Sequence, residues 1–362
     1  MAEKHPGKQP RRFSGRYAGL LLLTLLGACA GPSAPPQSIT TPSSGASASS
    51  AAISKDQVAL RTLLDQQNRL YRVAAPLLVT NAGLCRAGAR NLLGFTAKNK
   101  YSFPAELSKA AEKAGFGERL QVTGVLPDSG AQKSDVQVGD RLLAVADKSL
   151  PPGQDAEQRA AQLLGPLMLN ARNGIKLMLE RGTEPVSTTV PLTRACAYSI
   201  ELGNTDNVNS YSDGRRILIT QGMLDFTKTD EELAFVIAKE MAHSSLGHVQ
   251  RQKMMAIAGG IIDNLTKTRP DSTTLSGSPA LRPYPQDMDG NADTLSLYML
   301  VRAGYKIDDA PAFWRRLATR YPASTPNSHT ALHPSFASRM TVMERSLRTI
   351  KMKQETGKPL AP

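Results

Sequence analysis

The sequence lacks the features that identify small secreted scaffolds and membrane-spanning proteins. Only three of its 362 residues are cysteine, which excludes a densely disulfide-bonded scaffold. The N-terminal apolar run, Tyr17 to Leu26, is shorter than the about 20 residues that a membrane-spanning helix needs. No basic run with interleaved aromatic residues occurs, so the formal net charge of +13 does not indicate nucleic-acid binding. The apolar share of 41% is typical of a globular protein, and the length suggests two folded units.

The first 28 residues have the layout of a bacterial export signal. Several Lys and Arg residues precede the apolar run, which ends in Leu26-Gly27-Ala28-Cys29. This ending resembles the lipobox of bacterial lipoproteins, in which cleavage before the cysteine frees it for lipid modification. The resemblance implies a signal peptide at residues 1–28 and a lipidated Cys29 that attaches the chain to a membrane on the periplasmic side of the cell envelope. Ala30 fits sorting to the outer membrane, and an ordinary signal peptide cut after Ala30 is the alternative.

Residues 29–53 are predicted to form a disordered tether. They consist mostly of Pro, Ser, Ala, Thr and Gly and have too little bulky apolar surface to order themselves. Beyond the tether, the two remaining cysteines, Cys85 and Cys196, are candidates for a disulfide in an oxidising periplasm. Two separate buried thiols are the alternative.

Residues 54–89 are predicted to form the N-terminal helical part of a larger domain. Ser54 and Gln57 have the spacing of a capping box, and Leu and Val residues recur at helical spacing after them. We expect one amphipathic helix that ends at about Val79.

Residues 90–194 are predicted to form a small module of short strands with one helix near residues 156–164. The stretch Val125-Leu-Pro-Asp-Ser-Gly-Ala131, followed by Val136-Gln-Val-Gly-Asp-Arg-Leu-Leu143, resembles a PDZ domain. The resemblance implies that Leu93, Gly94 and Phe95 form a loop that binds the terminal carboxylate of a peptide, while the peptide adds a strand to the sheet. Residues 96–119 are a long insertion relative to that pattern. A rigid spacer without a ligand is the alternative.

Residues 195–362 carry an altered zinc-binding pattern. A predicted helix from about residue 230 to 250 contains Lys239-Glu240-Met241-Ala242-His243. In an HExxH helix, two histidines four residues apart lie on one face and bind one zinc ion, while the intervening glutamate polarises the bound water as general base. In this sequence, lysine replaces the first of the two histidines.

The sequence from Cys196 to about Leu347 resembles metallopeptidase family forty-eight, which includes HtpX and the CAAX prenyl proteases. The matching elements are the helix around residue 240, the ExxAD-like segment 289–293, the turn Ala303-Gly304-Tyr305, and His333-Pro334 with Arg339. The resemblance implies an α+β fold in which a mainly helical peptidase domain with a small sheet accompanies the β-rich module. It also implies zinc as the cofactor and unfolded or extended polypeptides as the binding partners.

By this resemblance, position 239 is the first zinc ligand, His243 the second, and Asp289 the third, where the family has glutamate. Glu240 is the general base, and His333 and Arg339 belong to the catalytic group.

Lys239 is the most consequential change to this set. An ammonium group has no lone pair for a metal, and deprotonating lysine at pH 7 costs about 4–5 kcal/mol. We therefore expect zinc affinity to be lost and Lys239 to pair with Asp289 and Glu240 in place of the ion. A rearranged zinc site that uses His243 with His333 is the alternative.

Three further segments concern access to this site. The predicted strand 215–220, with Ile217 and Ile219, is expected at the sheet edge to which such peptidases pair an extended substrate. The apolar run Met254–Ile262 is predicted to be core or a groove-lining hairpin, and the polar stretch Thr266–Gln286 a loop over the cleft.

Three functions are compatible with the sequence. The first is a zinc endopeptidase of envelope protein quality control. The second is a metal-free pseudopeptidase that binds polypeptides as an adaptor or chaperone, and the third is a purely structural lipoprotein. Lys239 and Asp289 favour the second.

Overall fold

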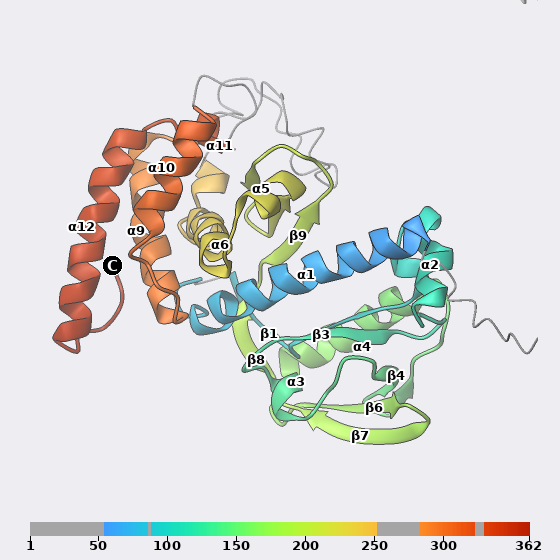
Figure 1. Cartoon of the computed structure of the whole chain (residues 1–362). Helices are drawn as coiled ribbons and strands as arrows, with labels where there is room; N and C mark the ends of the chain where they lie inside the picture. Colours follow the sequence, from blue (N-terminus) through green and yellow to red (C-terminus); the bar gives the residue numbers. More distant parts are fainter. Residues whose placement is uncertain (1–53, 86–87, 252–282, 323–328) are drawn as a thin grey trace, which may run out of the picture. The chain divides into compact units, whose positions relative to one another are not determined.

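The computed structural model describes residues 54–85, 88–251, 283–322 and 329–362, which belong to one compact unit (Figure 1). The fold is α+β, as predicted. The predicted signal peptide, the tether with Cys29, the apolar run at 254–262 and nearly all of the loop at 266–286 lie outside the described residues. Among the helices that are described, none combines the length and the apolar composition needed to cross a membrane.

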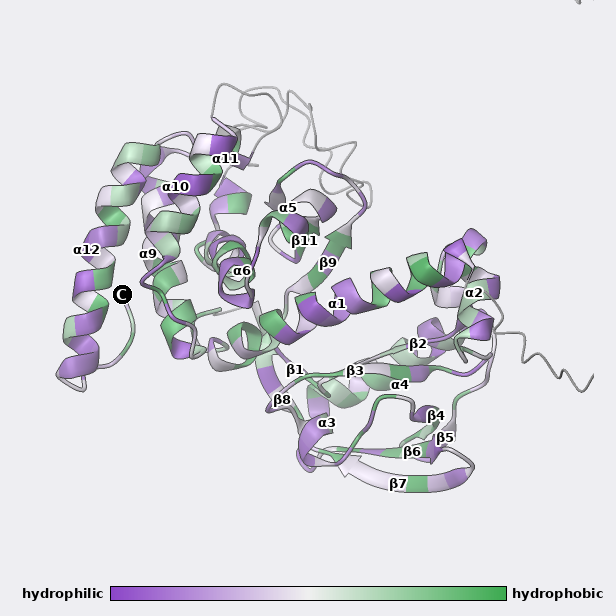
Figure 2. Cartoon of the chain, in the orientation of Figure 1, coloured by the Kyte–Doolittle hydropathy of each residue, from purple (hydrophilic) through white to green (hydrophobic). Residues whose placement is uncertain are grey.

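The first helix, α1 (Lys55–Thr80), confirms the predicted amphipathic helix. Ser54 caps it in a complete capping box with Gln57, so two of its otherwise unpaired N–H groups have side-chain acceptors. Hydrophobic and hydrophilic segments alternate along α1 and along the last helix in Figure 2, as expected for helices with one face on a core. The C-terminal half of α1 packs in the largest core through Leu70, Val73 and Leu77.

The chain enters and leaves the module through a short two-stranded ladder. Strand β1 (Ala89–Leu92) pairs antiparallel with β8 (Thr193–Cys196), with Ala89 opposite Cys196. The structure has a disulfide between Cys85 and Cys196, whose Cα atoms are 5.6 Å apart and 111 positions apart in sequence. The disulfide therefore joins the two ends of the module at its base.

The module contains a six-stranded sheet with its own core. The strands run in the order β2-β3-β4-β6-β7, and β5 pairs with β4. Their bounds are β2 (Phe95–Lys98), β3 (Gln121–Val125), β4 (Arg141–Val145), β5 (Lys148–Ser149), β6 (Ile175–Arg181) and β7 (Glu184–Val190), with helices α3 (Gly130–Lys133) and α4 (Ala156–Asn170). Strands β3, β4, β6 and β7 and helix α4 confirm elements predicted from the sequence, whereas β2 and β5 were not predicted as strands. Strand β2 forms one edge of the sheet.

The insertion after β2 attaches the module to α1. It forms the 3-10 turns η2 (Lys100–Ser102) and η3 (Ala105–Leu107) and helix α2 (Ser108–Lys113). Leu60 of α1 packs with Phe103 and Phe116 of the insertion in a small separate core, where the two rings meet edge to face at 5.0 Å. Helix α1 thus contributes one half to the large core and the other half to this contact.

The remaining part is a small sheet packed on helices. Strand β11 (Arg216–Thr220) pairs antiparallel with β10 (Ser210–Ser212) and parallel with β9 (Ser199–Gly203). The helices are α5 (Gln221–Phe226), α6 (Asp230–Ser245), α9 (Gln286–Arg302), α10 (Ala310–Arg320), α11 (His329–Leu332) and α12 (Phe336–Glu355). Helix α9 packs between α6 and α12 (Figure 1).

The prediction that Ile217 and Ile219 bind substrate at a sheet edge is wrong. Strand β11 is the central strand, and both isoleucine side chains are fully buried. The physical reason lies in the run Ile217-Leu218-Ile219, because consecutive apolar residues indicate a strand that is covered on both faces, whereas a half-exposed edge strand alternates.

Candidate functional site

Helix α6 places the altered zinc-binding motif in the centre of the large core. The hydroxyl of Thr229 accepts the N–H of Glu232 and starts the helix, which ends at Ser245, five residues earlier than predicted. All residues from Leu233 to His243 are buried. Lys239, Glu240 and His243 consequently lie inside the protein, and contacts with other buried groups decide their chemistry.

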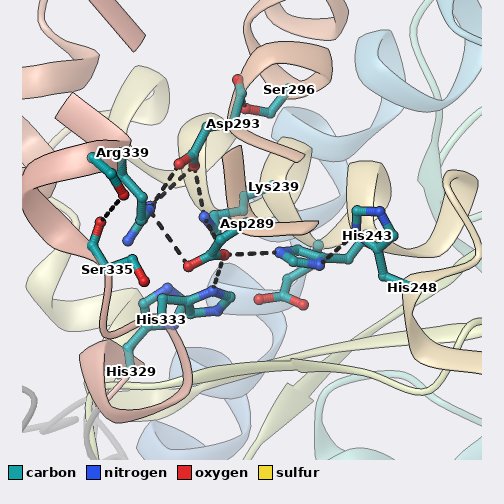
Figure 3. A network of polar contacts seen from close by, with 12 residues as sticks. Lys239, His243, His248, Asp289, Asp293, Ser296, His329, His333, Ser335 and Arg339 are labelled. Carbon is teal, nitrogen blue, oxygen red and sulfur yellow. Dashed lines mark hydrogen bonds and ion pairs between the residues drawn. The ribbon is translucent and has the colours of Figure 1, made fainter. Parts of the chain in front are cut away.

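Lys239 lies between two carboxylates of α9. Its side chain is fully buried, and Nζ is 2.6 Å from Asp293 Oδ1 and 3.0 Å from Asp289 Oδ1 (Figure 3). The pairing with Asp289 agrees with the sequence prediction. The structure replaces the second predicted partner, Glu240, by Asp293, because neighbouring helix positions point about 100° apart and cannot face one group together.

Arg339 of α12 completes this charged group. Its Nε and an Nη donate to both carboxylate oxygens of Asp293 at 2.8 and 3.1 Å, and its Nε is 3.8 Å from Asp289 Oδ2. Burial raises the pKa of Asp293, but Arg339 and Lys239 outweigh burial and lower it. The pKa of Asp289 is also lowered, because His333 and Lys239 outweigh the effect of burial. The positive charges of Lys239 and Arg339 therefore balance the negative charges of the two aspartates without a metal ion.

Histidines surround Asp289 on its other side. His333 Nδ1 lies 2.5 Å and His243 Nε2 3.3 Å from Asp289 Oδ1. His248 Nδ1 lies 3.2 Å from His243 Nδ1. Burial lowers the pKa of His243 and His248 to about 4 and that of His333 to about 3. These rings are neutral at pH 7, so they add no charge to the group.

Glu240 points to a different set of partners. It accepts a hydrogen bond of 2.8 Å from the hydroxyl of Ser210 on β10, which also lies 3.1 Å from Nδ1 of His329. Burial raises the pKa of Glu240 to about 7, because the hydrogen bond from Ser210 and the charge of Lys239 only partly offset desolvation. Sequence reasoning did not identify Ser210 or assign a role to His329, since long-range packing brings both to Glu240.

The site does not fit a metal ion at the position that the resemblance implies. His243, Asp289 and His333 do bring three possible ligand atoms within 4.8 Å of one another. However, an ion bonded to Asp289 at about 2 Å would lie within about 5 Å of Lys239 Nζ, which is 3.0 Å from that oxygen. A dication and an ammonium at this distance repel each other by about 7 kcal/mol at an effective dielectric constant of about 20.

The residues of the predicted carboxylate-binding loop lie in the module, apart from this group. Leu93 is buried, and Phe95 begins the edge strand β2. Gly94 has a φ of +96°, and a Cβ atom there would lie 2.1 Å from Cβ of Ser129. Glycine is required at this turn both for its backbone conformation and for its close approach to α3.

Comparisons with known proteins agree with the resemblance in the C-terminal part. Residues 179–346 match the sequence model of Peptidase family M48. The chain is 24% identical over 253 residues to the Beta-barrel assembly-enhancing protease of Yersinia pestis, covering 65% of this chain and 49% of that protein. It is 26% identical over 150 residues to the Mitochondrial metalloendopeptidase OMA1 of Schizosaccharomyces pombe, covering 40% and 44%. The chain thus spans about half the length of these curated relatives.

Solved structures match a smaller part of the chain. The HtrA-type protease AlgW with a decapeptide is 24% identical and covers 29% of this chain and 30% of its own, with a TM-score of 0.21. The HtrA3 PDZ domain bound to a phage-derived ligand is 17% identical and covers 29% and 88%, also with a TM-score of 0.21.

Proposed function

The matches to M48 metallopeptidases support a metalloendopeptidase-like role in the cell envelope or in protein quality control, and we propose that this chain fills that role as a pseudopeptidase. It binds extended polypeptides and holds no metal ion at the position that the family uses. One observation carries the proposal: the ammonium group of Lys239 lies between Asp289 and Asp293, 3.0 and 2.6 Å from their oxygens. This group fixes a single positive charge where a metallopeptidase needs a Lewis acid.

Loss of the ion removes the step that peptide hydrolysis requires. A zinc ion lowers the pKa of bound water from 15.7 to about 7 and polarises the scissile carbonyl. Glu240 alone, with a pKa of about 7, is far too weak a base to deprotonate free water. The ammonium of Lys239 has its carboxylate partners and is fully buried, so it does not replace the ion toward a substrate.

Polypeptide binding is assigned to the edge strand of the module. Strand β2 lies at the end of its sheet and is only partly buried, so its outer edge can receive an added strand. The turn at Gly94 immediately precedes this edge, where a peptide carboxylate would bind. Strand β10, the edge nearest Glu240, is less suitable because Ser210, Tyr211 and Ser212 are all buried.

The proposed location is the periplasmic side of the cell envelope, at the outer membrane. The predicted lipoprotein signal, Cys29 and the tether support it, and the Yersinia relative is named for β-barrel assembly. A lipidated Cys29 would hold the chain at a membrane surface, from which it would receive unfolded or extended polypeptides.

Restoring the ligand set tests the loss of hydrolysis. We expect the full-length chain not to cleave casein with zinc present, and the Lys239→His, Asp289→Glu variant to acquire zinc-dependent cleavage. Lys176→His is the matched control, since Lys176 pairs with the exposed Asp147 in the module. Casein cleavage by the natural chain that a chelator abolishes would show a working metalloendopeptidase, which the match over residues 179–346 favours.

Peptide binding tests the second part of the proposal. A decapeptide with a free, apolar C-terminal residue should bind the full-length chain at least about 10-fold more tightly than the same peptide with a C-terminal amide, because amidation removes the charge that the loop recognises. Fluorescence anisotropy measures both affinities. Equal affinities, or no binding of either peptide, would leave the module as a spacer.

A further inference from the structure

A second group of possible metal ligands lies beside Lys239. Glu240, His329 and His333 bring three ligand atoms within 4.8 Å of one another, and all three side chains are buried. His329 and Glu240 are not metal ligands in the resemblance described above. This group contains neither Lys239 nor the Asp289 carboxylate to which Lys239 is bound.

The hydrogen bonds of Ser210 leave a lone pair on His329. The hydroxyl proton of Ser210 goes to Glu240 at 2.8 Å, so the 3.1 Å contact with His329 is made by its Nδ1–H. In a neutral ring, Nε2 then carries no proton. This Nε2 atom is buried and has no hydrogen-bond partner among the residues that the structure describes. A buried lone pair without a donor is costly, and a metal ion would satisfy it.

His333 is oriented in a similar way. The atom next to its Nδ1 is Asp289 Oδ1, a carboxylate oxygen that accepts hydrogen bonds. Nδ1 therefore donates to Asp289 Oδ1 at 2.5 Å, and the other nitrogen keeps its lone pair. A carboxylate that receives one ring N–H while the other nitrogen binds a metal is the usual arrangement around histidine ligands.

Glu240 supplies the negative charge that such a site needs. Asp289 and Asp293 both have Lys239 and Arg339 within 4 Å, whereas no ion pair of Glu240 occurs in the described part of the chain. A divalent cation would supply the positive charge that the buried Glu240 carboxylate lacks.

We infer that Glu240, His329 and His333 bind one divalent transition-metal ion of the zinc type, displaced from the position that Lys239 occupies. Two imidazoles and a carboxylate are suitable zinc ligands. The ion joins the segment that contains α11 and His333 to helix α6. Glu240 becomes a ligand and is no longer free to act as a base, so the site stabilises the fold without hydrolysing peptides.

Cobalt and zinc binding to the full-length chain tests this site. We expect one equivalent of Co²⁺ to give the absorption spectrum of a four-coordinate site and Zn²⁺ to displace it. His329→Gln and Glu240→Gln should each weaken binding by more than about 100-fold, since loss of an orienting partner alone costs 10–100-fold. His243→Gln is the matched control and should bind Co²⁺ as the natural chain does.

A positive signature separates a ligand from a structural residue. His329→Cys should give a thiolate-to-cobalt charge-transfer band that the natural chain lacks, which a merely structural role for His329 would not produce. The inference is overturned if the natural chain binds no Co²⁺ or Zn²⁺, or if His243→Gln abolishes binding while His329→Gln retains it.

Metal binding and casein cleavage, measured on the same chain, test the displaced metal site and the pseudopeptidase separately. Bound metal without casein cleavage supports both statements. Bound metal with cleavage overturns only the pseudopeptidase, whereas absence of metal together with absence of cleavage overturns only the displaced site.

Discussion

The module (residues 90–194) keeps most of its charged side chains near the surface, whereas the peptidase-like part (the described residues from 195 onward) buries several of them. In the module, the sheet encloses an apolar core, and the buried Asp140 is held by Arg181, whose side chain is 31% exposed. In the peptidase-like part, Lys239, Asp289, Asp293 and Arg339 are all buried together. Burying two ion pairs costs much desolvation energy and gives little net stability compared with apolar packing. The proposed function explains such a cluster as an altered metal site, and it requires of the module only the open edge of β2.

The largest expected effect concerns the Cys85–Cys196 disulfide, which joins the two ends of the module at its base. Replacing Cys85 and Cys196 by Ala should lower the free energy of unfolding by about 5 kcal/mol, because a crosslink across about 100 residues restricts the unfolded chain. Urea denaturation of both forms measures the change. A loss below about 1 kcal/mol would show that β1, β8 and the contact between α1 and the insertion hold the module without it.

Breaking the buried charge cluster should have the next largest effect. Lys239→Ala leaves Asp289 and Asp293 with too little positive charge and should destabilise the chain by about 4 kcal/mol. Lys176→Ala in the module removes a pair whose side chains are 49% and 75% exposed and should cost less than about 1 kcal/mol. Denaturant titrations of the two variants test the contrast directly. Equal losses would contradict the difference between the regions.

Acidification should lower the folding stability of the peptidase-like part and not that of the module, because the module contains no histidine. His243, His248 and His333 have folded pKa values of about 4, 4 and 3. Each therefore contributes stability that is complete above its unfolded pKa of about 6.5 and is lost as the pH falls toward the folded value. Glu240 has the opposite sign, because its pKa is raised to about 7 and its protonation favours the folded state.

His329 contributes with the same sign, because burial lowers its pKa well below the usual value. The net loss between pH 6.5 and 5 should be about 5 kcal/mol, since each pKa unit corresponds to about 1.4 kcal/mol and Glu240 offsets one of the four histidines. Hydrogen exchange of amides in α6 and in β6 at the two pH values measures it, with rates corrected for the intrinsic effect of pH. Opening of α6 should become easier at pH 5, while that of β6 stays unchanged. Glu240→Gln should make the loss larger.

Much of the fold followed from local patterns in the sequence. The capping box at Ser54, strands β3, β4, β6 and β7 of the module and the start of helix α6 all come from short-range signals, and the structure has them where the sequence predicts them. The pairing of Lys239 with Asp289 also followed, because the resemblance brought the two positions together. Helical geometry also predicts Asp293 as a second partner of Lys239, because it lies four residues after Asp289 on the same face of α9.

The rest depends on packing between distant segments. Ser210 meets His329 across 119 positions, and Leu60 meets Phe103 and Phe116 only after the module has folded. No spacing in the sequence encodes such contacts. The central place of β11, in contrast, is encoded locally, because an uninterrupted apolar run indicates a strand that is covered on both faces.

The smallest expected effect concerns α1, which contributes to both regions. Ser54→Ala removes the side-chain acceptor for Gln57 N–H and should cost about 1 kcal/mol, the usual effect of losing an N-cap. The loss should appear as faster hydrogen exchange in the first turns of α1 and in α2, which pack on each other, and not in α6 or α9. Ser54→Asp is the control, since its carboxylate can accept the same N–H and should restore protection. If Ser54→Ala instead accelerated exchange in α9, α1 would transmit changes from the module contact to the charged site, and the two regions would not be energetically separate.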